Sequence, residues 1–299
     1  MNENEIQYHL AAVQGSLPLV QSYISGNNKI NVDCVDEEGT TTLILAAANN
    51  HLDIVKELIA NRASVNARRK TGTTALFFAA QGGHLSVVQE LLNDGADIDL
   101  PSNEGGTPLF VACQCNHVNV VKELVQRTAN IHAKMKDGAT PLFVASQNGH
   151  LNVVKFLLQK GAQVNQQRED MASPLWIAAQ EGHALVVKEL LASGATVDLA
   201  RKDGGTSLFK AAHKGHYDAV AELLAHGASI ELLKNGESAL HAAALFGHLN
   251  IAKKLVESGA DPHVQNKDGF TPLDLAKDAN REETVLYLST ARKSYSTTV

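Results

Sequence analysis

Cysteine, long apolar runs and basic charge are all scarce in this chain. Its 299 residues include only three cysteines, Cys34, Cys113 and Cys115, too few for a disulfide framework. No apolar run approaches the roughly 20 residues that a membrane-spanning helix needs. The first residues are polar and acidic, unlike a secretory signal, and no Asn-x-Ser/Thr acceptor occurs. These absences predict an intracellular, cytoplasmic protein without membrane insertion, and they leave a nuclear location open.

The charge balance and the missing motifs exclude further classes. The chain has 26 Lys and Arg against 32 Asp and Glu, a formal charge of −6. No stretch has the dense basic charge that binds a phosphate backbone, so nucleic acid is not expected as a partner. Nucleophile elbows, phosphate-binding glycine loops, metalloprotease helices and dinucleotide fingerprints are also missing. We therefore expect no enzymatic activity, no cofactor, no metal and no small-molecule substrate.

What the chain does contain is a repeat. Leucines recur every 33 residues from Leu43 to Leu208, and Leu240 and Leu273 continue the series at spacings of 32 and 33. Around each leucine the sequence resembles residues 138–162, which contain Thr-Pro-Leu, Gly-His and Gly-Ala at fixed offsets. Self-similarity at a period of 20–50 residues is typical of stacked repeat proteins.

One repeat predicts two short helices. Thr140 is a good N-cap, and Pro141 suits the first helical position, where an N–H is not needed. Leu151, Val154, Leu157 and Leu158 form the apolar face of a second helix, which Gly161 ends. Helices of about ten residues are unstable alone in water, so each pair needs a neighbouring repeat. The pattern predicts a linear stack of helix pairs with one continuous core.

The Thr-Pro-Leu-x-x-Ala signature at a 33-residue period, with Gly-His and Gly-Ala-Asp, resembles the ankyrin repeat. The resemblance implies an all-α solenoid of helix-turn-helix units joined by short β-hairpin-like loops. It predicts a single domain over 1–288, with polar terminal repeats as caps, and a flexible C-terminal tail over 289–299. The nine repeats that we expect are 4–36, 37–69, 70–102, 103–135, 136–168, 169–201, 202–233, 234–266 and 267–288.

Seven histidines occupy one column of the repeat: His51, His84, His117, His150, His183, His216 and His248. Stacked helices lie about 8–10 Å apart, whereas zinc needs nitrogens about 2 Å from one ion, so successive members cannot share a metal. Each is interpreted as a structural histidine at the start of a second helix.

An aromatic column follows the repeated leucine, and it has two interpretations. Its members are His9, Ile44, Phe77, Phe110, Phe143, Trp176, Phe209 and His241. They could form a hydrophobic recognition strip, or pack between adjacent repeats. The leucine beside each favours core packing.

Four residues further on is a polar column, Gln81, Gln114, Gln147, Gln180 and His213. The resemblance implies that this position lies on the exposed first-helix surface facing a concave groove. The amide row could bind an extended peptide, or glutamine could serve only as a good exposed helix former. The next column varies most and includes Glu181, Lys214 and Phe246. We predict non-catalytic binding of a partner protein or peptide through these two columns, with the chain as a scaffold or adaptor.

Two further signals concern other partners. Thr297 and Val299 resemble a class I PDZ ligand, a pattern short enough to arise by chance. An alternative function is therefore a structural spacer that links a PDZ-type scaffold, through the tail, to another protein. Asn66 and Asn165 match the ankyrin asparagine that the resemblance implies can be hydroxylated, which would make an asparaginyl hydroxylase an incidental partner.

Overall fold

The computed structural model describes residues 1–25, 30–231, 233–234 and 236–292, and its helices gather in two compact units. The first unit is Met1–Pro141 and the second Leu142–Val299. Among the described residues there are eighteen helices, no regular strand and one isolated antiparallel bridge, Val35 to Thr41. The all-α class predicted from the sequence is confirmed.

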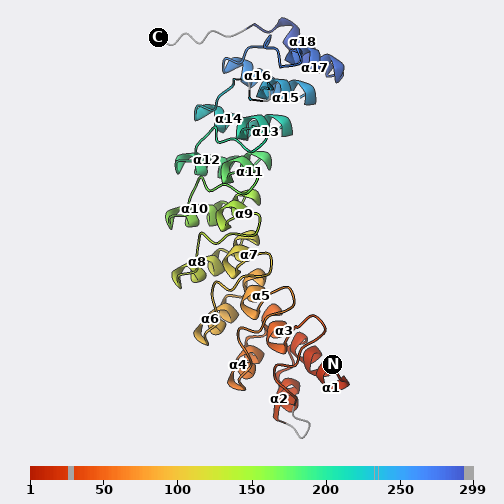
Figure 1. Cartoon of the computed structure of the whole chain (residues 1–299), viewed down its shortest axis with the longest axis vertical. Helices are drawn as coiled ribbons and strands as arrows, with labels where there is room; N and C mark the ends of the chain where they lie inside the picture. Colours follow the sequence, from red (N-terminus) through yellow and green to blue (C-terminus); the bar gives the residue numbers. More distant parts are fainter. Residues whose placement is uncertain (26–29, 232, 235, 293–299) are drawn as a thin grey trace. The chain divides into compact units, whose positions relative to one another are not determined.

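Four helix pairs form the first unit. They are α1 (Glu3–Val13) and α2 (Leu17–Ser25), α3 (Thr42–Ala48) and α4 (Leu52–Ala60), α5 (Ala75–Gly82) and α6 (Leu85–Asn93), and α7 (Pro108–Gln114) and α8 (Val118–Gln126). In Figure 1 the first helix of each pair lies beside the first helix of the next pair, and the second helices form another row.

The other five pairs belong to the second unit, apart from the first residue of α9. They are α9 (Pro141–Gln147) and α10 (Leu151–Gln159), α11 (Pro174–Gln180) and α12 (Ala184–Ala192), α13 (Ser207–Lys214) and α14 (Tyr217–Ala225), α15 (Ala239–Phe246) and α16 (Leu249–Glu257), and α17 (Pro272–Asp278) and α18 (Glu282–Thr290). The last helix runs past the predicted domain end at 288, and Leu288 is one of its buried residues. The rest of the predicted tail, 293–299, lies outside the described residues.

Seven of the described first helices begin at a capping hydroxyl, namely α3, α5, α7, α11, α13, α15 and α17. The side chain of Thr107 accepts a hydrogen bond from the backbone N–H of Phe110, and Pro108 takes the first helical position. Ser173 and Thr206 cap α11 and α13 in the same way. Each cap satisfies a backbone donor that the helix leaves unpaired, which is worth about 1 kcal/mol.

Small side chains let the first helices pack closely. The alanines at the centre of each, such as Ala79, Ala112, Ala178 and Ala211, are completely buried, and so are the repeated leucines beside them. The second helices bury a Val-Val-x-x-Leu face, for example Val186, Val187 and Leu190. Since each pair covers the apolar face of the next, stability comes from contacts between neighbouring repeats.

The connections between pairs are hairpin-like turns, as predicted. In one of them the N–H of Arg201 donates to the carbonyl of Gly205 at 3.1 Å, across a turn whose Gly204 has a φ of 86°. Successive turns are also joined, because the N–H of Lys202 donates to the carbonyl of Asp170 at 3.0 Å. Within each unit, hydrogen bonds thus join successive turns in a row. This row lies on the side of the unit where the first helices begin.

Six described residues other than glycine hold a left-handed backbone conformation at positions where other repeats have glycine. Three of them, Asn50, Asn116 and Asn280, follow first helices, and asparagine tolerates this conformation well. Arg62 (φ 62°) and Thr128 (φ 68°) follow second helices, and Met171 (φ 65°) lies in a hairpin turn. Thr128 is the most strained of these residues, since a β-branched side chain strongly disfavours positive φ.

Replacing Thr128 with glycine is expected to stabilise the protein by about 1 kcal/mol, the cost of the left-handed conformation less the extra freedom of glycine in the unfolded chain. Urea unfolding followed by circular dichroism measures this as a higher midpoint. Thr128→Ala is the control, because alanine keeps the penalty at positive φ. An equal gain from alanine would contradict a backbone origin.

Candidate functional site

The histidines of the repeated column form hydrogen bonds to the preceding repeat. Six of them occupy the N-cap position of a second helix without bonding to that helix through the side chain. Instead, the Nε2–H of each donates to a main-chain carbonyl in the preceding first helix, 2.8 to 3.3 Å away; these six are His51, His84, His117, His183, His216 and His248. The ring also packs against the glycine that ends that helix: a Cβ at Gly182 would lie 2.5 Å from Nδ1 of His216. The interpretation as structural histidines is confirmed.

In the glutamine column the backbone carbonyls bond to the next repeat, whereas the side chains lie at the surface. The carbonyls of Gln81, Gln147 and Gln180 accept the histidine bonds at 2.8, 3.0 and 2.9 Å. The side chains of Gln81 and Gln114 are exposed, and those of Gln147 and Gln180 are half-buried. The Gln180 amide already donates to the Glu181 carboxylate at 2.8 Å. A fixed backbone thus presents side chains that are free to vary.

We call this surface the first-helix face. It consists of the exposed or half-buried side chains at the ends of the first helices, namely Gln81 and Gln114 in the first unit and Gln147, Gln180, Glu181, His213, Lys214 and Phe246 in the second.

The aromatic column lies in the core. Phe143, Trp176 and His241 are at most 3% exposed, whereas Phe77 and Phe209 are half-buried. The ring of Trp176 donates from Nε1 to the carbonyl of Gly205 at 3.0 Å, which ties α11 to the following hairpin. Core packing, the interpretation favoured from the sequence, is confirmed, so these rings do not form an exposed strip.

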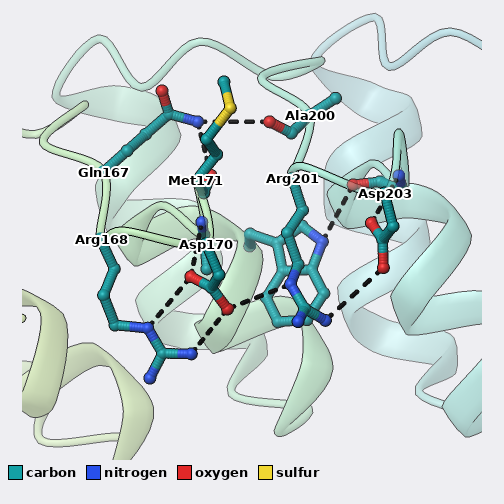
Figure 2. A network of polar contacts seen from close by, with 10 residues as sticks. Gln167, Arg168, Asp170, Met171, Ala200, Arg201 and Asp203 are labelled. Carbon is teal, nitrogen blue, oxygen red and sulfur yellow. Dashed lines mark hydrogen bonds and ion pairs between the residues drawn. The ribbon is translucent and has the colours of Figure 1, made fainter. Parts of the chain in front are cut away.

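A charged network surrounds Asp170 in the second unit (Figure 2). Its carboxylate accepts two bonds from Arg168, at 3.0 and 2.7 Å, and a third from Nε of Arg201 at 3.1 Å. The bonds from Arg168 outweigh the effect of partial burial and lower the pKa of Asp170 to about 2. Arg201 also pairs with Asp203 at 3.6 Å. The carboxylate thus orders two guanidinium groups from adjacent hairpins.

Both guanidinium groups lie over aromatic rings. Arg168 is 5.1 Å from the ring centroid of Phe143, and Arg201 is 5.0 Å from that of Trp176. The ammonium of Lys210 lies 5.7 Å from the same tryptophan ring. Cations over aromatic faces contribute about 0.5–2 kcal/mol each. Trp176 is therefore the centre of a cluster that joins three successive repeats.

The end of α13 carries three basic side chains on one surface. Lys210, His213 and Lys214 are three and four residues apart, the spacing of side chains that share a helix face. Burial, and then Lys214 and Arg201, lower the pKa of Lys210. Burial, and then Lys210 and Lys214, lower the pKa of His213. The positive charges of Lys210, Lys214 and Arg201 therefore disfavour further positive charge at this end of α13.

An aromatic side chain borders this basic surface. The rings of His213 and Phe246 have centroids 4.4 Å apart, and Phe246 is 40% exposed. The Nδ1 atom of His213 is buried and has no hydrogen-bond partner among the described residues. Sequence analysis selected His213, Lys214 and Phe246 but missed Lys210. The signal was available, because Lys210 occupies a column that is otherwise apolar (Leu45, Phe78, Val111, Val144, Ile177 and Ala242).

Asn66 and Asn165 hold neighbouring repeats together. Asn165 Nδ2 donates to the carbonyl of Gly194 at 3.3 Å, and its Oδ1 accepts from the N–H of Thr196 at 2.8 Å. Asn66 makes the equivalent bonds to Gly95 and Asp97. Both residues are exposed, yet both ends of each amide are occupied by the next repeat.

The other predicted features have these outcomes. Thr297 and Val299 lie outside the described residues. Within the described part, no group of three or more His, Cys, Asp or Glu is arranged to hold a metal ion, and no helix combines the length and apolar character needed to cross a membrane.

A shallow pocket of about 500 Å³ lies between hairpins, where Met171 and Leu233 are flanked by Lys202, Lys234 and acidic residues.

The geometry described above, helix pairs that stack through capped first helices, histidine bonds and hairpin turns, defines an ankyrin solenoid. A family model described as ankyrin repeats in three copies matches residues 8–102, 95–168, 175–266 and 232–298. The chain therefore belongs to the ankyrin repeat family, whose repeats are protein–protein interaction modules and are typically non-enzymatic.

Individual relatives match shorter segments. A 47-residue segment is 49% identical to human ankyrin repeat domain-containing protein 29, and covers 16% of either chain. A 58-residue segment is 40% identical to zebrafish Notch-regulated ankyrin repeat-containing protein B, and covers 19% of this chain and 52% of the relative. The crystal structure of the human ASB11 ankyrin repeat domain superposes with a TM-score of 0.68 at 29% identity, over 74% of this chain and 98% of that one. The curated relatives are thus matched over about half of their length or less.

Proposed function

We propose that this protein is a non-catalytic adaptor that binds a partner protein or peptide through the first-helix face. The observation that carries the proposal is that the backbone and the side chains of this surface have separate roles. The histidine bonds fix the backbone carbonyls of the glutamine column, while the next column carries exposed side chains that differ between repeats, such as Glu181, Lys214 and Phe246. A rigid backbone with variable side chains binds with little loss of scaffold entropy.

Two features fit the same proposal. The described cysteines are all free thiols, as a reducing intracellular compartment keeps them, so we place the adaptor inside the cell, in the cytoplasm. Asn66 and Asn165 are exposed and lie where an asparaginyl hydroxylase could reach them after local opening of the inter-repeat bonds. We treat such an enzyme as an incidental partner and not as the ligand of the first-helix face.

Affinity capture from cell lysate tests the proposal unit by unit. One variant of the full chain carries Gln81→Arg and Gln114→Arg, and another carries Gln147→Arg and Gln180→Arg. Since arginine adds bulk and charge at the exposed helix ends, we expect one of these variants to lose at least nine-tenths of a partner that the unaltered protein captures.

The control variant carries Gln126→Arg and Gln159→Arg, the same chemical change at exposed positions of the second helices α8 and α10. It is expected to retain the partner, and circular dichroism checks that every variant is folded. Retention of all partners by both first-helix variants would refute binding through the glutamine column.

A further inference from the structure

The repeat over 202–233 has an unusual set of side chains on the exposed part of its first helix. Lys210 replaces an apolar residue, His213 replaces a glutamine, and Lys214 falls in the column that is Asn148 in the repeat over 136–168. Lys210 and Lys214 add positive charge and His213 adds an imidazole ring, and all three fall on one face of α13. Like charges four residues apart destabilise a helix slightly, so this arrangement does not serve the stability of the repeat.

These basic groups lack acidic partners within the described structure. No carboxylate lies within ion-pair distance of Lys210 or Lys214 among the described residues, whereas Lys155 and Lys188, on second helices, pair with Glu189 and Glu222. Asp203, the acidic group that acts on Lys210, already pairs with Arg201.

An apolar anchor completes the surface. Phe246 is 40% exposed and Leu245 is 36% exposed, next to the ring of His213. Aromatic residues at the edge of a charged surface are common energetic centres of protein interfaces. A ligand that fits must therefore offer carboxylates to Lys210 and Lys214 and an apolar side chain to Phe246.

We infer that Lys210, His213, Lys214 and Phe246 form a binding site for an acidic peptide segment that carries an aromatic or aliphatic residue among its carboxylates. The inference rests on the proposed function, since it names the chemistry of the partner for the second unit. Complementary charge sets the orientation of such a peptide and speeds its association. A nucleic acid fits less well, because the carboxylate of Asp203 lies close enough to Lys210 to act on it and the chain carries a formal charge of −6.

Peptide titration on the full chain tests this site. The probe is a short fluorescein-labelled peptide of glutamates around a central phenylalanine, followed by fluorescence anisotropy. Trp176 is the only tryptophan of the chain and lies 5.7 Å from the Lys210 ammonium, so the emission of Trp176, recorded with the unlabelled peptide, reports on the same site. We expect saturable binding that weakens as salt is added, and no binding of the same peptide with lysines in place of glutamates.

Two variants locate the site. Lys210→Glu with Lys214→Glu is expected to weaken peptide binding at least tenfold. Lys210→Val with Lys214→Asn reproduces the residues of the repeat over 136–168, Val144 and Asn148, so it is expected to fold at least as well as the unaltered chain and still lose most of the binding. The matched control, Lys122→Glu on α8 with Lys160→Glu at the C-cap of α10, changes the net charge as much as the double glutamate variant does and is expected to leave affinity within twofold.

The inference is overturned if the glutamate peptide does not bind the unaltered chain, or if the control variant loses as much affinity as the Lys210 and Lys214 variants. Tighter binding of an oligothymidylate than of the peptide would also overturn it and would indicate a phosphate-backbone ligand. If the glutamine-column variants lose their partner while the Lys210 and Lys214 variants keep both it and the peptide, the adaptor function stands and only the acidic-peptide site fails.

Discussion

Alanine at position 182 should lower the free energy of unfolding by about 3 kcal/mol, whereas alanine at position 194 should cost only about 1–2 kcal/mol. Both glycines have positive φ, 78° and 86°, so each substitution incurs the strain of a left-handed backbone. Only Gly182 faces a neighbour: a Cβ there would lie 2.5 Å from the ring of His216, while nothing lies within 4 Å of a Cβ at Gly194. Urea unfolding measured by circular dichroism gives the two losses.

A double-mutant cycle separates the steric effect from backbone strain. His216→Ala alone removes the 2.9 Å bond to the carbonyl of Gln180, which costs about 1–3 kcal/mol. The double variant with Gly182→Ala has no histidine ring for the new Cβ to clash with. The losses in unfolding free energy of the two single variants should therefore add up to at least 1 kcal/mol more than the loss of the double variant. Equal losses at positions 182 and 194, with additive behaviour in the cycle, would show that histidine packing does not restrict the glycine.

The sequence predicts the helix pairs because every determinant of a pair is local. A capping hydroxyl, a proline at the first helical position and an apolar face at helical spacing fall within 25 residues and recur at a fixed period. The same regularity placed the histidines at the start of the second helices and the aromatic column in the core. These features can be predicted without knowing which repeats are in contact.

The partners across repeats are harder to infer. His216 bonds to a carbonyl 36 residues earlier, and Asp170 orders an arginine 31 residues later. Periodicity shows that such residues recur but does not show which atoms meet, since that depends on how far one pair is displaced along the next. Lys210 is difficult to recognise for another reason: its column is apolar in the other repeats, so that position is expected to face the core.

Removing the charge of Asp170 should destabilise the second unit by about 1–2 kcal/mol near neutral pH. In Asp170→Asn the amide can still accept the hairpin bond from the N–H of Ala172, 3.1 Å away in the native structure. It no longer offers charge to Arg168 and Arg201, whose side chains are 28% and 32% exposed. Urea unfolding at several pH values measures the difference from the unaltered chain.

The pH dependence has a definite sign. Because the pKa of Asp170 is lowered to about 2 in the fold, its stabilisation is fully present above the ordinary carboxyl value of about 4 and is lost as the pH falls toward 2. The difference between Asp170→Asn and the unaltered chain should thus be constant from about pH 7 to pH 5 and shrink below about pH 4.

Asp203→Asn is the matched control, since Asp203 occupies the same hairpin position one repeat later and accepts the same kind of turn bond, from the N–H of Gly205. Its side chain is 63% exposed and makes one ion pair at 3.6 Å, so the expected loss is below about 0.5 kcal/mol. Comparable losses for the two variants would mean that the turn, and not the pairing of two arginines, determines the effect. A larger loss at Asp170 assigns the stabilisation to the charged network that holds Arg201 over Trp176, beside the proposed peptide site.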